Sequence, residues 1–505
     1  MPEVDYTRDE LSDMLSIYIL IDDAIKGSKQ IKSKGETYLP KPNSTDTSAE
    51  NTARYDAYLE RAMWTNFVRR TLVGLNGQVF MREPIFTVPD EMQPLVDSVD
   101  GEVSLKQQVK QTNSDVLAFG RCGLLTDYPV VDGNPTRLQI KLGEVRPVIN
   151  QYKPWQVINW DRKNRGSMTI LSLVVIVEQN LKATDGFYKE YQDQWRVLDL
   201  DENDEYRVRI YTKQPVKVDN GRADIYEFSE KPDEEFRPTD SDGNRWNIIP
   251  FTFVGSENNG PDIDFPPMYD IAVLNLGHFR NSADYEESSF IVGQPTPVFS
   301  GLTESWMERF FTNNKVYLGS RASISLPEGG RAELLQPDPN TMPYEAMKLK
   351  EAQIIALGGK LIQPTAIERT ATEANIEKSA ENSILASTAG NVGSAYQQHL
   401  VWGAKFQGAP TDDIEFVLPT EFDLAMMSPE ERRQLTDEVL AGLITRDEAR
   451  NALRKSGIAT LPNDDAFLDI DTKKKEEEER AMSNELKLAS QQTVDDADNE
   501  STDGA

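Results

Sequence analysis

One stretch, from Pro343 to Phe406, limits what this chain can fold into more than any other. It predicts a helix over Tyr344–Leu357, a break at Gly358-Gly359, and a much longer helix over Thr370–Phe406. The long segment has no proline, and at ~1.5 Å per residue it would exceed roughly 50 Å in length. Ala, Ser, Gly, Asn and Gln dominate it, whereas the helices of an ordinary enzyme core are richer in large aliphatic residues. We therefore expect close packing against identical neighbours around a solvated channel; the alternative is an exposed helical hairpin in a monomer.

The charge of the chain limits how it can bind nucleic acid. It has 505 residues, of which 84 are acidic and 54 basic, giving a net charge of −30. This length predicts roughly two to four domains or lobes. Because affinity for phosphate comes from Lys and Arg, we do not expect a basic groove that grips DNA. Acidic walls would still let DNA pass without sticking, and the alternative is that the acidity only keeps the protein soluble.

Cysteine and targeting signals are sparse. The single cysteine, Cys122, lies in the apolar run Ala118–Leu125, so no intrachain disulfide can form and a small core residue is expected. The first residues, MPEVDYTRDE, lack the apolar segment of a signal peptide. The longest apolar run, around Leu173–Val177, is far shorter than the ~20 residues that span a bilayer. We expect a soluble protein that is intracellular when made and has no membrane partner.

The N-terminal quarter is predicted to be mainly helical. Thr7-Arg8-Asp9-Glu10 is typical of a capping box, and the helix that it opens has four apolar residues on one side: Leu11, Leu15, Tyr18 and Ile19. Residues 27–52 are polar and are expected to form a loop. An amphipathic helix is predicted over Tyr55–Leu75, with these side chains inward: Tyr58, Met63, Phe67, Leu72 and Leu75.

Turn residues separate the elements that follow. Asn76-Gly77 is expected to end the helix, and short strands are predicted at Val79-Phe80 and Ile85–Val88. A further helix is predicted over Ser104–Phe119, with Gly120 as its C-cap, and a strand starts at Gly123. From 146 to 254, β-branched and aromatic runs alternate with turn clusters, which predicts one antiparallel meander. Its expected strands are Val157–Trp160, Ile170–Glu178, Tyr188–Leu198, Tyr206–Thr212, Ala223–Phe228 and Ile248–Val254.

The second half alternates helices with a small insert. Pro266-Pro267 is expected to open a helix over Met268–Ser288. A compact mixed insert is predicted at 297–340, with these parts: strands at Val298-Phe299, Lys315–Leu318 and Ala332–Leu335, a helix over Glu304–Phe311 and a turn at Gly329-Gly330. After the long helix we predict a strand at Ile414–Leu418 and two helices, to Ala441 and over Thr445–Ser456. The last residues, 471–505, are expected to form a charged, disordered tail.

The usual signatures of catalysis and metal binding are missing. Gly358-Gly359-Lys360 lacks the first glycine and the Ser or Thr of a phosphate-binding loop, and a hinge between helices is favoured. Asp199–Asn203 begins like a calcium loop, but Asp204 replaces its glycine, so a polar turn is favoured. The two histidines, His278 and His399, are expected to be packed or surface side chains. We predict no catalytic residue, no metal and no cofactor; carboxylate-only hydrolysis has no motif and stays open.

Several segments, in their order along the chain, point to one protein family. They are Ile249-Pro250-Phe251, Gly255–Gly260, Pro266–Ala272, Asn281–Glu286, Arg369–Ala374, Ser428–Arg432 and Gly442–Ala449. Together with the order of helices and insert, they resemble the tailed-bacteriophage portal protein, the head-to-tail connector, with the closest resemblance to the uncharacterised-type phage portal family. The resemblance covers roughly residues 50–460, and the order of the motifs is more specific than any one of them.

The resemblance implies an α+β portal fold with a helical and antiparallel-β wing, a helical stem, a small αβ clip, a long tunnel or wing helix and a helical crown. The implied parts are: 1–265 N-terminal region and wing, 266–290 first stem helix, 291–341 clip, 342–357 second stem helix, 358–369 tunnel loop, 370–410 long wing helix, 411–470 C-terminal wing and crown, and 471–505 tail.

The same resemblance implies a non-enzymatic ring, typically a dodecamer, at one vertex of the virion capsid. Double-stranded DNA would pass through it, without sequence recognition, during packaging and ejection. Its further partners would be the terminase large subunit, a head-tail adaptor, and major capsid and scaffold proteins, with assembly in the host cytoplasm. Two alternatives stay open: a carboxylate-dependent polysaccharide hydrolase, and a tail or baseplate structural protein that conducts no DNA.

Four sets of residues are the candidate sites. The tunnel loop would hold Gly358, Gly359, Lys360, Gln363 and Pro364. Candidate contacts to DNA in the channel are Lys348, Lys350, Lys360 and Arg369, for which an ion pair between subunits or at the surface is an equal alternative. The long helix is expected to kink at Gly390, Gly393 and Ser394. The candidate contact surface of the clip is Glu304, Trp306, Arg309 and Arg321.

Overall fold

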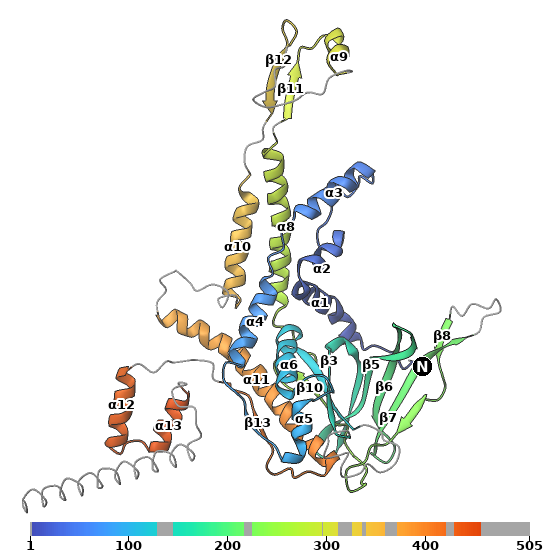
Figure 1. Cartoon of the computed structure of the whole chain (residues 1–505), viewed down its shortest axis with the longest axis vertical. Helices are drawn as coiled ribbons and strands as arrows, with labels where there is room; N and C mark the ends of the chain where they lie inside the picture. Colours follow the sequence, from blue (N-terminus) through green and yellow to red (C-terminus); the bar gives the residue numbers. More distant parts are fainter. Residues whose placement is uncertain are drawn as a thin grey trace, which may run out of the picture. The chain divides into compact units, whose positions relative to one another are not determined.

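The computed structural model describes these residues: 3–128, 145–216, 225–294, 296–311, 326–335, 340–358, 371–420 and 429–455. They divide into two compact units, Met1–Glu421 and Phe422–Ala505, and each is described by itself (Figure 1). The first unit combines helices with antiparallel strands, which confirms the predicted α+β class. None of the described helices is both long and apolar enough to cross a bilayer.

The N-terminal region is helical, as expected. Its helices are α1 (Asp9–Lys26), α2 (Ser28–Ser33), α3 (Ala49–Arg61), α4 (Phe67–Val79), α5 (Gln93–Asp97) and α6 (Leu105–Phe119). Helix α6 starts at a capping box made by Ser104 and Gln107, and it ends at Gly120 with a φ of 79°. Both signals were readable in the sequence, and the prediction of this helix is confirmed.

The prediction of one helix over Tyr55–Leu75 is wrong, because the chain breaks between α3 and α4. Asn66 caps α4 by accepting a hydrogen bond from the Arg69 amide at 2.9 Å. Asn275, on a distant helix, accepts hydrogen bonds from the amides of Phe67 and Val68 at 3.0 and 3.3 Å. Contacts from a distant helix therefore satisfy the free backbone amides at the start of α4. The hydrophobic periodicity of the sequence does not reveal such contacts.

Four smaller predictions in this region are also wrong. The expected capping box before α1 does not form, because the N-cap is Arg8 and no side chain caps the helix. The expected loop at 27–52 contains α2. Met63 is 61% exposed and Ile19 is also exposed, although both were expected to point inward. Asn76-Gly77 does not end α4, so the expected strand at Val79-Phe80 is helix and C-cap.

The strands form two main sheets. The larger has the order β4-β5-β6-β7-β8, with β9 beside β7, and its strands are β4 (Val157–Arg165), β5 (Met168–Asp185), β6 (Tyr188–Leu200), β7 (Tyr206–Val216), β8 (Ile225–Phe228) and β9 (Glu234–Phe236). The smaller has the order β10-β2-β3, with β2 (Arg121–Asp127), β3 (Val148–Tyr152) and β10 (Phe251–Gly255). The predicted meander thus holds for β4–β8, but β3 and β10 pair with β2, a partner that strand spacing could not reveal.

Two antiparallel helices follow, with a small insert between them in the sequence. They are α8 (Tyr269–Val292) and α10 (Met342–Ala356), and the insert contains β11 (Thr296–Ser300), α9 (Glu304–Phe311) and β12 (Arg331–Leu335). Contacts run in opposite directions along the pair, since Lys350 packs on Gly277 while the Tyr344 ring lies 5.8 Å from the Tyr285 ring. Both strands lie where the sequence predicted strands, and they pair antiparallel with each other. The predicted strand at Lys315–Leu318 lies outside the described residues.

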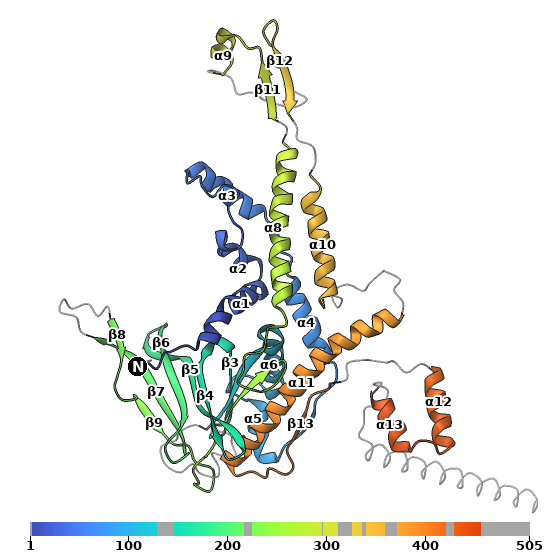
Figure 2. The ribbon, with the colours of Figure 1, turned by 180° about the vertical axis from the view of Figure 1, so that it is seen from behind.

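The long helix α11 (Ala371–Gln407) is continuous over 37 residues, close to its predicted bounds. Its C-terminal half packs between β13 (Glu415–Val417) and the smaller sheet (Figures 1 and 2). β13 pairs antiparallel with β1 (Ile85–Thr87), so a two-stranded sheet lies on the other side of α11.

The second unit contains two described helices, α12 (Pro429–Leu440) and α13 (Arg446–Lys455). Gly442, with a φ of 71°, follows the first. A capping box opens the second, because Glu448 accepts a hydrogen bond from the Thr445 amide at 2.7 Å while its own amide donates to the Thr445 hydroxyl at 3.2 Å. The two helices are where the sequence placed them. The expected tail at 471–505 lies outside the described residues.

Candidate functional site

The α8–α10 pair, with its insert and the start of the following break, holds most of the candidate site residues. α8 is tied to the N-terminal helices by polar contacts. The Tyr58 hydroxyl donates to Asp284 at 2.6 Å, and Arg61 forms an ion pair with Glu287. Deeper in the unit, the Asn275 side chain also donates to the Thr65 carbonyl at 2.9 Å. These contacts fix α8 on one side and leave α10 packed on another.

The two candidate lysines of α10 have different surroundings. The Lys348 ammonium lies 4.5 Å from the centre of the Tyr344 ring, on an exposed part of the helix. Lys350 lays its aliphatic chain over Gly277, where an added Cβ would come within 2.8 Å of Lys350 Cε. Two residues apart on a helix, they cannot share one face. Contact of either lysine with DNA stays a prediction.

The surface of the pair is more acidic than basic. Together α8 and α10 carry six acidic residues and three Lys or Arg. They also expose apolar side chains at several points along their length: Val273, Phe290, Ile291, Met342 and Leu349, with Leu357 just after α10. Apolar side chains scattered in this way are normal on a protein surface, so the acidity is the distinguishing property of the pair.

Most of the predicted tunnel loop lies outside the described residues, including Gly359, Lys360, Gln363 and Pro364, and so does Arg369. Gly358 is described. Its φ of 114° is a conformation that side chains with a Cβ rarely adopt. Helix α10 therefore ends at a break that needs glycine at position 358. Of the predicted hinge, this residue alone lies within the described part of the chain.

Most side chains of the described part of the insert are exposed, and the others are half-buried. Every residue of β12 is exposed, including Leu334 and Leu335. Val298 on β11 and Met307 on α9 are exposed as well. Exposed apolar side chains grouped in this way are typical of a contact with another chain.

The four candidate residues of the clip surface are only partly described. Glu304 starts α9 and is exposed, and Trp306 is half-buried on the same helix. The backbone of Arg309 belongs to α9, but its side chain lies outside the description, as does the whole of Arg321. Their role as a contact surface stays a prediction.

The three residues expected to kink α11 lie within its continuous part. Gly390 and Ser394 are exposed, and Gly393 is buried. A Cβ on Gly393 would lie 3.2 Å from the Leu418 amide nitrogen, so this glycine lets the chain beside β13 approach closely. Close packing accounts for this glycine without a kink, which stays a prediction.

Several small residues of α11 whose side chains are described do not contact a neighbouring copy, as was expected, but pack within their own chain. Ala389, Ala395 and Ala404 are buried in the core of the same chain. A Cβ on Gly403 would contact Leu95 at 3.3 Å and Met92 at 3.5 Å. The expectation that these residues contact identical neighbours is therefore wrong for the buried ones, whereas for the exposed Gly390 and Ser394 it stays a prediction. The buried ones are small because α6, β2, β10 and β13 crowd around this half of the helix.

Both histidines are packed side chains, as favoured from the sequence. His399 is fully buried, with its Nδ1 atom 2.7 Å from the Thr126 hydroxyl, and burial lowers its pKa to about 3. His278 is buried against the Phe67 ring, and its Nε2 atom lies 3.1 Å from Glu351. With its lowered pKa, His399 does not have the surroundings of a catalytic base near neutral pH.

A polar hollow of about 730 Å³ lies beside α6 and β3. Asp115 faces it and is buried, and burial raises its pKa, although Lys153 donates to its carboxylate at 2.5 Å. Nearby, Arg196 bridges Asp127 at 2.9 Å and Glu178 at 3.1 Å. Each carboxylate therefore faces a cation, as in a structural ion-pair network. Neighbouring Cys122 is buried, which raises the pKa of its thiol and makes it the inert core residue expected.

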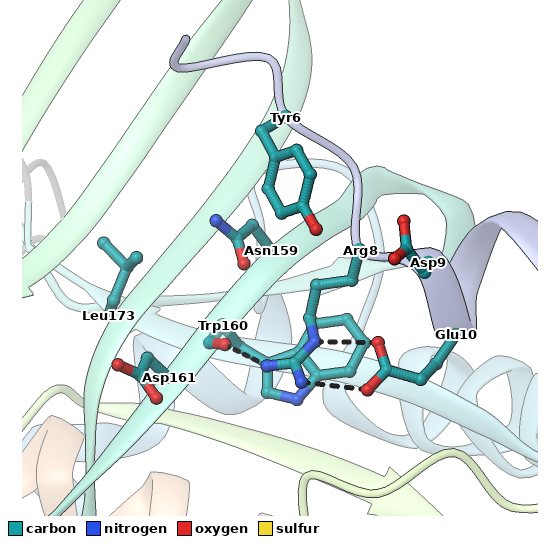
Figure 3. A pocket seen from close by; sticks show the side chains of 8 residues that line it. All are labelled: Tyr6, Arg8, Asp9, Glu10, Asn159, Trp160, Asp161 and Leu173. Atoms are coloured by element: carbon teal, nitrogen blue, oxygen red, sulfur yellow. Dashed lines mark hydrogen bonds and ion pairs between the residues drawn. The ribbon is translucent and has the colours of Figure 1, made fainter. Parts of the chain in front are cut away.

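A second hollow, of about 400 Å³, lies where α1 meets β4 (Figure 3). Arg8 donates to the Trp160 carbonyl at 2.7 Å and to both oxygens of Glu10 at 3.0 and 3.2 Å. The Arg8 guanidinium lowers the pKa of Glu10 to about 2. This single arginine is fully engaged, and the other charged side chains of the hollow, Asp9 and Asp161, are acidic. The hollow anchors α1 and is not suited to an anion such as phosphate.

Among the described residues, no group of three or more His, Cys, Asp or Glu side chains is arranged to hold a metal ion. The stretch Asp199–Asn203 forms the polar turn that was favoured over a calcium loop: Asp201 accepts hydrogen bonds from the amides of Asn203 and Glu205 at 2.9 and 3.0 Å. The absence of a cofactor stays an expectation.

Sequence reasoning missed the residues that hold α8 in place, above all Asn275 and the Tyr58–Asp284 pair. No motif marks them. The only available signal was a polar residue, Asn275, among the apolar residues Ile271, Leu276 and Phe279 of a predicted helix. A buried polar side chain in such a setting needs a partner from another element.

Comparison with known proteins gives a partial family match and distant structural similarity. Residues 267–407, which include α8, the insert, α10 and α11, match the family model "Domain of unknown function (DUF4055)". No curated protein matches the chain. Among solved structures, a chain from "Neck of native GTA particle computed with C12 symmetry" is similar at 16% identity and a TM-score of 0.40, covering 77% of this chain and 89% of that one. A chain from "Neck of empty GTA particle computed with C6 symmetry" aligns at 15% identity and a TM-score of 0.38, covering 78% and 90%. Both scores are low, so neither alignment decides the fold or the function.

Proposed function

We propose that this chain is the subunit of a portal ring, the head-to-tail connector of a phage-like particle. Double-stranded DNA would pass through the ring during packaging and ejection. The observation that carries this proposal is the antiparallel α8–α10 pair, interrupted by an insert with an exposed strand, β12, and followed by a glycine break and a 37-residue helix. This order of parts is the one that the sequence resemblance implies.

Within the proposed ring, α8 and α10 are the stem helices, the insert is the clip, and the chain after Gly358 is the tunnel loop. The acidic character of the stem helices suits a channel wall, because phosphates would not bind tightly to it. The few lysines, Lys348 among them, would supply weak and reversible contacts. The exposed apolar residues of the insert suit a surface that meets other chains, first a terminase motor and later a tail adaptor.

The state of assembly tests the proposal directly. We expect the purified 57.0 kDa chain to form rings with an axial hole wide enough for a DNA duplex, typically of twelve subunits, in negative-stain electron microscopy. Light scattering should give a mass that is a multiple of the chain mass. A monodisperse monomer at all accessible concentrations would refute the proposal. Rings or spikes without such a hole would favour a non-conducting tail or baseplate protein, and hydrolysis of a polysaccharide panel would favour a glycosidase.

The glycine break offers a second test, which addresses the channel and leaves assembly aside. Gly358 has a φ of 114°, so replacing Gly358 and Gly359 with Ala forces a new path on the chain. Because α10 and α11 keep their own packing, we expect rings to form normally while DNA packaging is impaired. Normal packaging by the double variant would show that this break is not the tunnel loop.

A further inference from the structure

The larger sheet has a two-stranded extension, which we call the arm and define as Gln179–Tyr191. The pairing of β4 with β5 begins at Val157↔Ile176, and that of β7 with β6 begins at Thr212↔Gln194. Beyond these points β5 and β6 pair only with each other, out to Asp185↔Tyr188. The arm therefore has two backbone edges that pair with no other described strand, a state that proteins usually protect or use.

The arm carries aromatic and apolar side chains that contact solvent. Phe187, at its tip, is fully exposed, and Tyr188 is 69% exposed. Leu181 and Tyr191, which face each other across the two strands, are exposed too. Tyrosine and phenylalanine supply large contact area at little entropic cost, and a cluster of them on a surface is typical of an interface.

The arm also differs from the rest of the chain in charge. The fully exposed run Gln179–Lys189 contains Lys182 and Lys189 but only one acidic residue, Asp185. Glu190, next in the chain, forms an ion pair with Lys182 at 2.6 Å. With Lys182, Lys189, Asp185 and Glu190 the arm is neutral overall, so on a chain with a net charge of −30 it can approach the acidic surface of another copy without the repulsion that most of the chain would meet.

A surface that fits the arm lies on the two-stranded sheet β1–β13. It exposes Ile85 at 53% and Val417 at 46%. Next to them is a hollow of about 540 Å³, and four acidic residues line it: Asp90, Asp412, Asp413 and Glu415. None of the four has an ion-pair partner within the described ranges. Apolar groups beside unpaired acids are what the arm, with its aromatic and Lys side chains, would match.

One chain cannot join its own two surfaces. β6 and β8 lie beyond the smaller sheet, on one side of α11, and β13 lies on the other side in both views (Figures 1 and 2). We propose that the arm of one copy docks on the β1–β13 surface of a second copy. Because two different surfaces meet, the contact is heterologous and propagates from copy to copy until a ring closes. The inference rests on the proposed ring and names a contact that orders neighbouring subunits in it.

Charge reversal tests the pairing. The variant Lys182→Glu with Lys189→Glu places acidic groups against the acidic hollow, so we expect self-association to weaken by roughly tenfold or more in analytical ultracentrifugation. The variant Asp412→Lys with Asp413→Lys should weaken it similarly. Combining all four substitutions restores opposite charges across the contact and should restore assembly. Two weakened double variants with no recovery in the combined variant would overturn the pairing.

Cysteine cross-linking tests the geometry independently, because the natural Cys122 is buried. Phe187→Cys combined with Asp413→Cys should give a ladder of oligomers on non-reducing gels after mild oxidation. The matched control is Met168→Cys combined with Asp413→Cys, since Met168 is also exposed, at 64%, but lies at the other end of β5 and should give no ladder. Wild-type rings without a ladder from the first pair would overturn the docking and leave the ring intact. A wild-type chain that stays monomeric would overturn both.

Discussion

Asn275 is the side chain whose removal tests how α8 is held. It is fully buried on α8 and makes three hydrogen bonds to the break between α3 and α4. Its Oδ1 atom accepts from the amides of Phe67 and Val68 at 3.0 and 3.3 Å, and its Nδ2 atom donates to the Thr65 carbonyl at 2.9 Å. One side chain therefore joins the proposed stem helix to the start of α4.

The size of the effect follows from these three bonds. Asn275→Ala removes all of them and leaves the Val68 amide, which is buried, without an acceptor. A net loss of about 1 kcal/mol for each hydrogen bond gives a destabilisation of about 3 kcal/mol. Because about 1.4 kcal/mol is a factor of ten, local opening should become roughly 150 times more frequent. Asn275→Asp keeps an acceptor for both amides, but its second oxygen would face the Thr65 carbonyl in a fully buried site, so this variant should lose stability as well.

Hydrogen-exchange mass spectrometry on peptides that cover residues 62–70 measures this opening. We expect Asn275→Ala to lose protection there by about two powers of ten, and Asn275→Asp to lose protection as well. The matched control is Asn281→Ala, on the same helix, because the Asn281 Nδ2 atom is buried without a hydrogen-bond partner among the described residues. Equal exchange in Asn275→Ala and wild type, or equal loss in Asn281→Ala, would refute the reasoning.

Three further predictions concern the core of the first unit. Burial holds the pKa of His399 at about 3, against 6.5 for the free side chain, so between pH 6.5 and pH 3 only the unfolded chain binds this proton. The free energy of unfolding should therefore fall by up to about 1.4 kcal/mol per pH unit as the pH drops through that range. In His399→Gln, urea midpoints should depend less on pH. Gly120→Ala should destabilise the chain by about 2–3 kcal/mol in urea titrations, because its φ is 79° and its Cβ would lie 2.6 Å from a backbone oxygen, whereas Gly77→Ala in open space within α4 should stabilise by roughly 0.5–1 kcal/mol. Gly403→Leu should lower the free energy of unfolding by about 1–3 kcal/mol, because the larger side chain overpacks the core, while Gly403→Ala should change it little. A larger loss in Gly403→Ala than in Gly403→Leu would contradict the packing described for α11.

Elements with strong local signals were predictable from the sequence. Helix α6 has its capping box at Ser104 and its glycine C-cap at Gly120, and both are formed by neighbours in the chain. Helix α8 follows Pro266-Pro267 and runs four residues beyond its predicted end. In such places the residues that decide the structure lie within one turn of the element, so a local pattern contains the necessary information.

Features set by distant contacts were not predictable. The break between α3 and α4 depends on Asn275, more than 200 residues away, and the prediction of one helix there failed. The pairing of β10 with β2 joins residues more than 120 positions apart, and strand spacing gives no partner for either. Of the candidate site, the lysines of α10 and the glycine break could be located, but the exposed arm at Phe187 could not, because exposure depends on where β4 and β7 stop pairing.

The packing of α11 changes where contacts between copies should be sought. Its small residues suggested an interface along the whole helix, yet most of the described half is buried in its own chain, so a substitution such as Gly403→Leu should reduce stability before it affects assembly. Besides Ile384 on α11 itself, exposed apolar groups lie on α8, on α10, on the insert, on the arm and on β1–β13. A substitution such as Phe187→Ser removes no buried contact of its own chain, and surface changes of this kind alter folding stability little. It should therefore reduce assembly while leaving the unfolding midpoint of the dissociated chain unchanged. Measuring assembly and folding stability separately thus distinguishes the buried small residues of α11 from the exposed apolar residues. A loss of both in Phe187→Ser would mean that the arm supports the fold of its own chain.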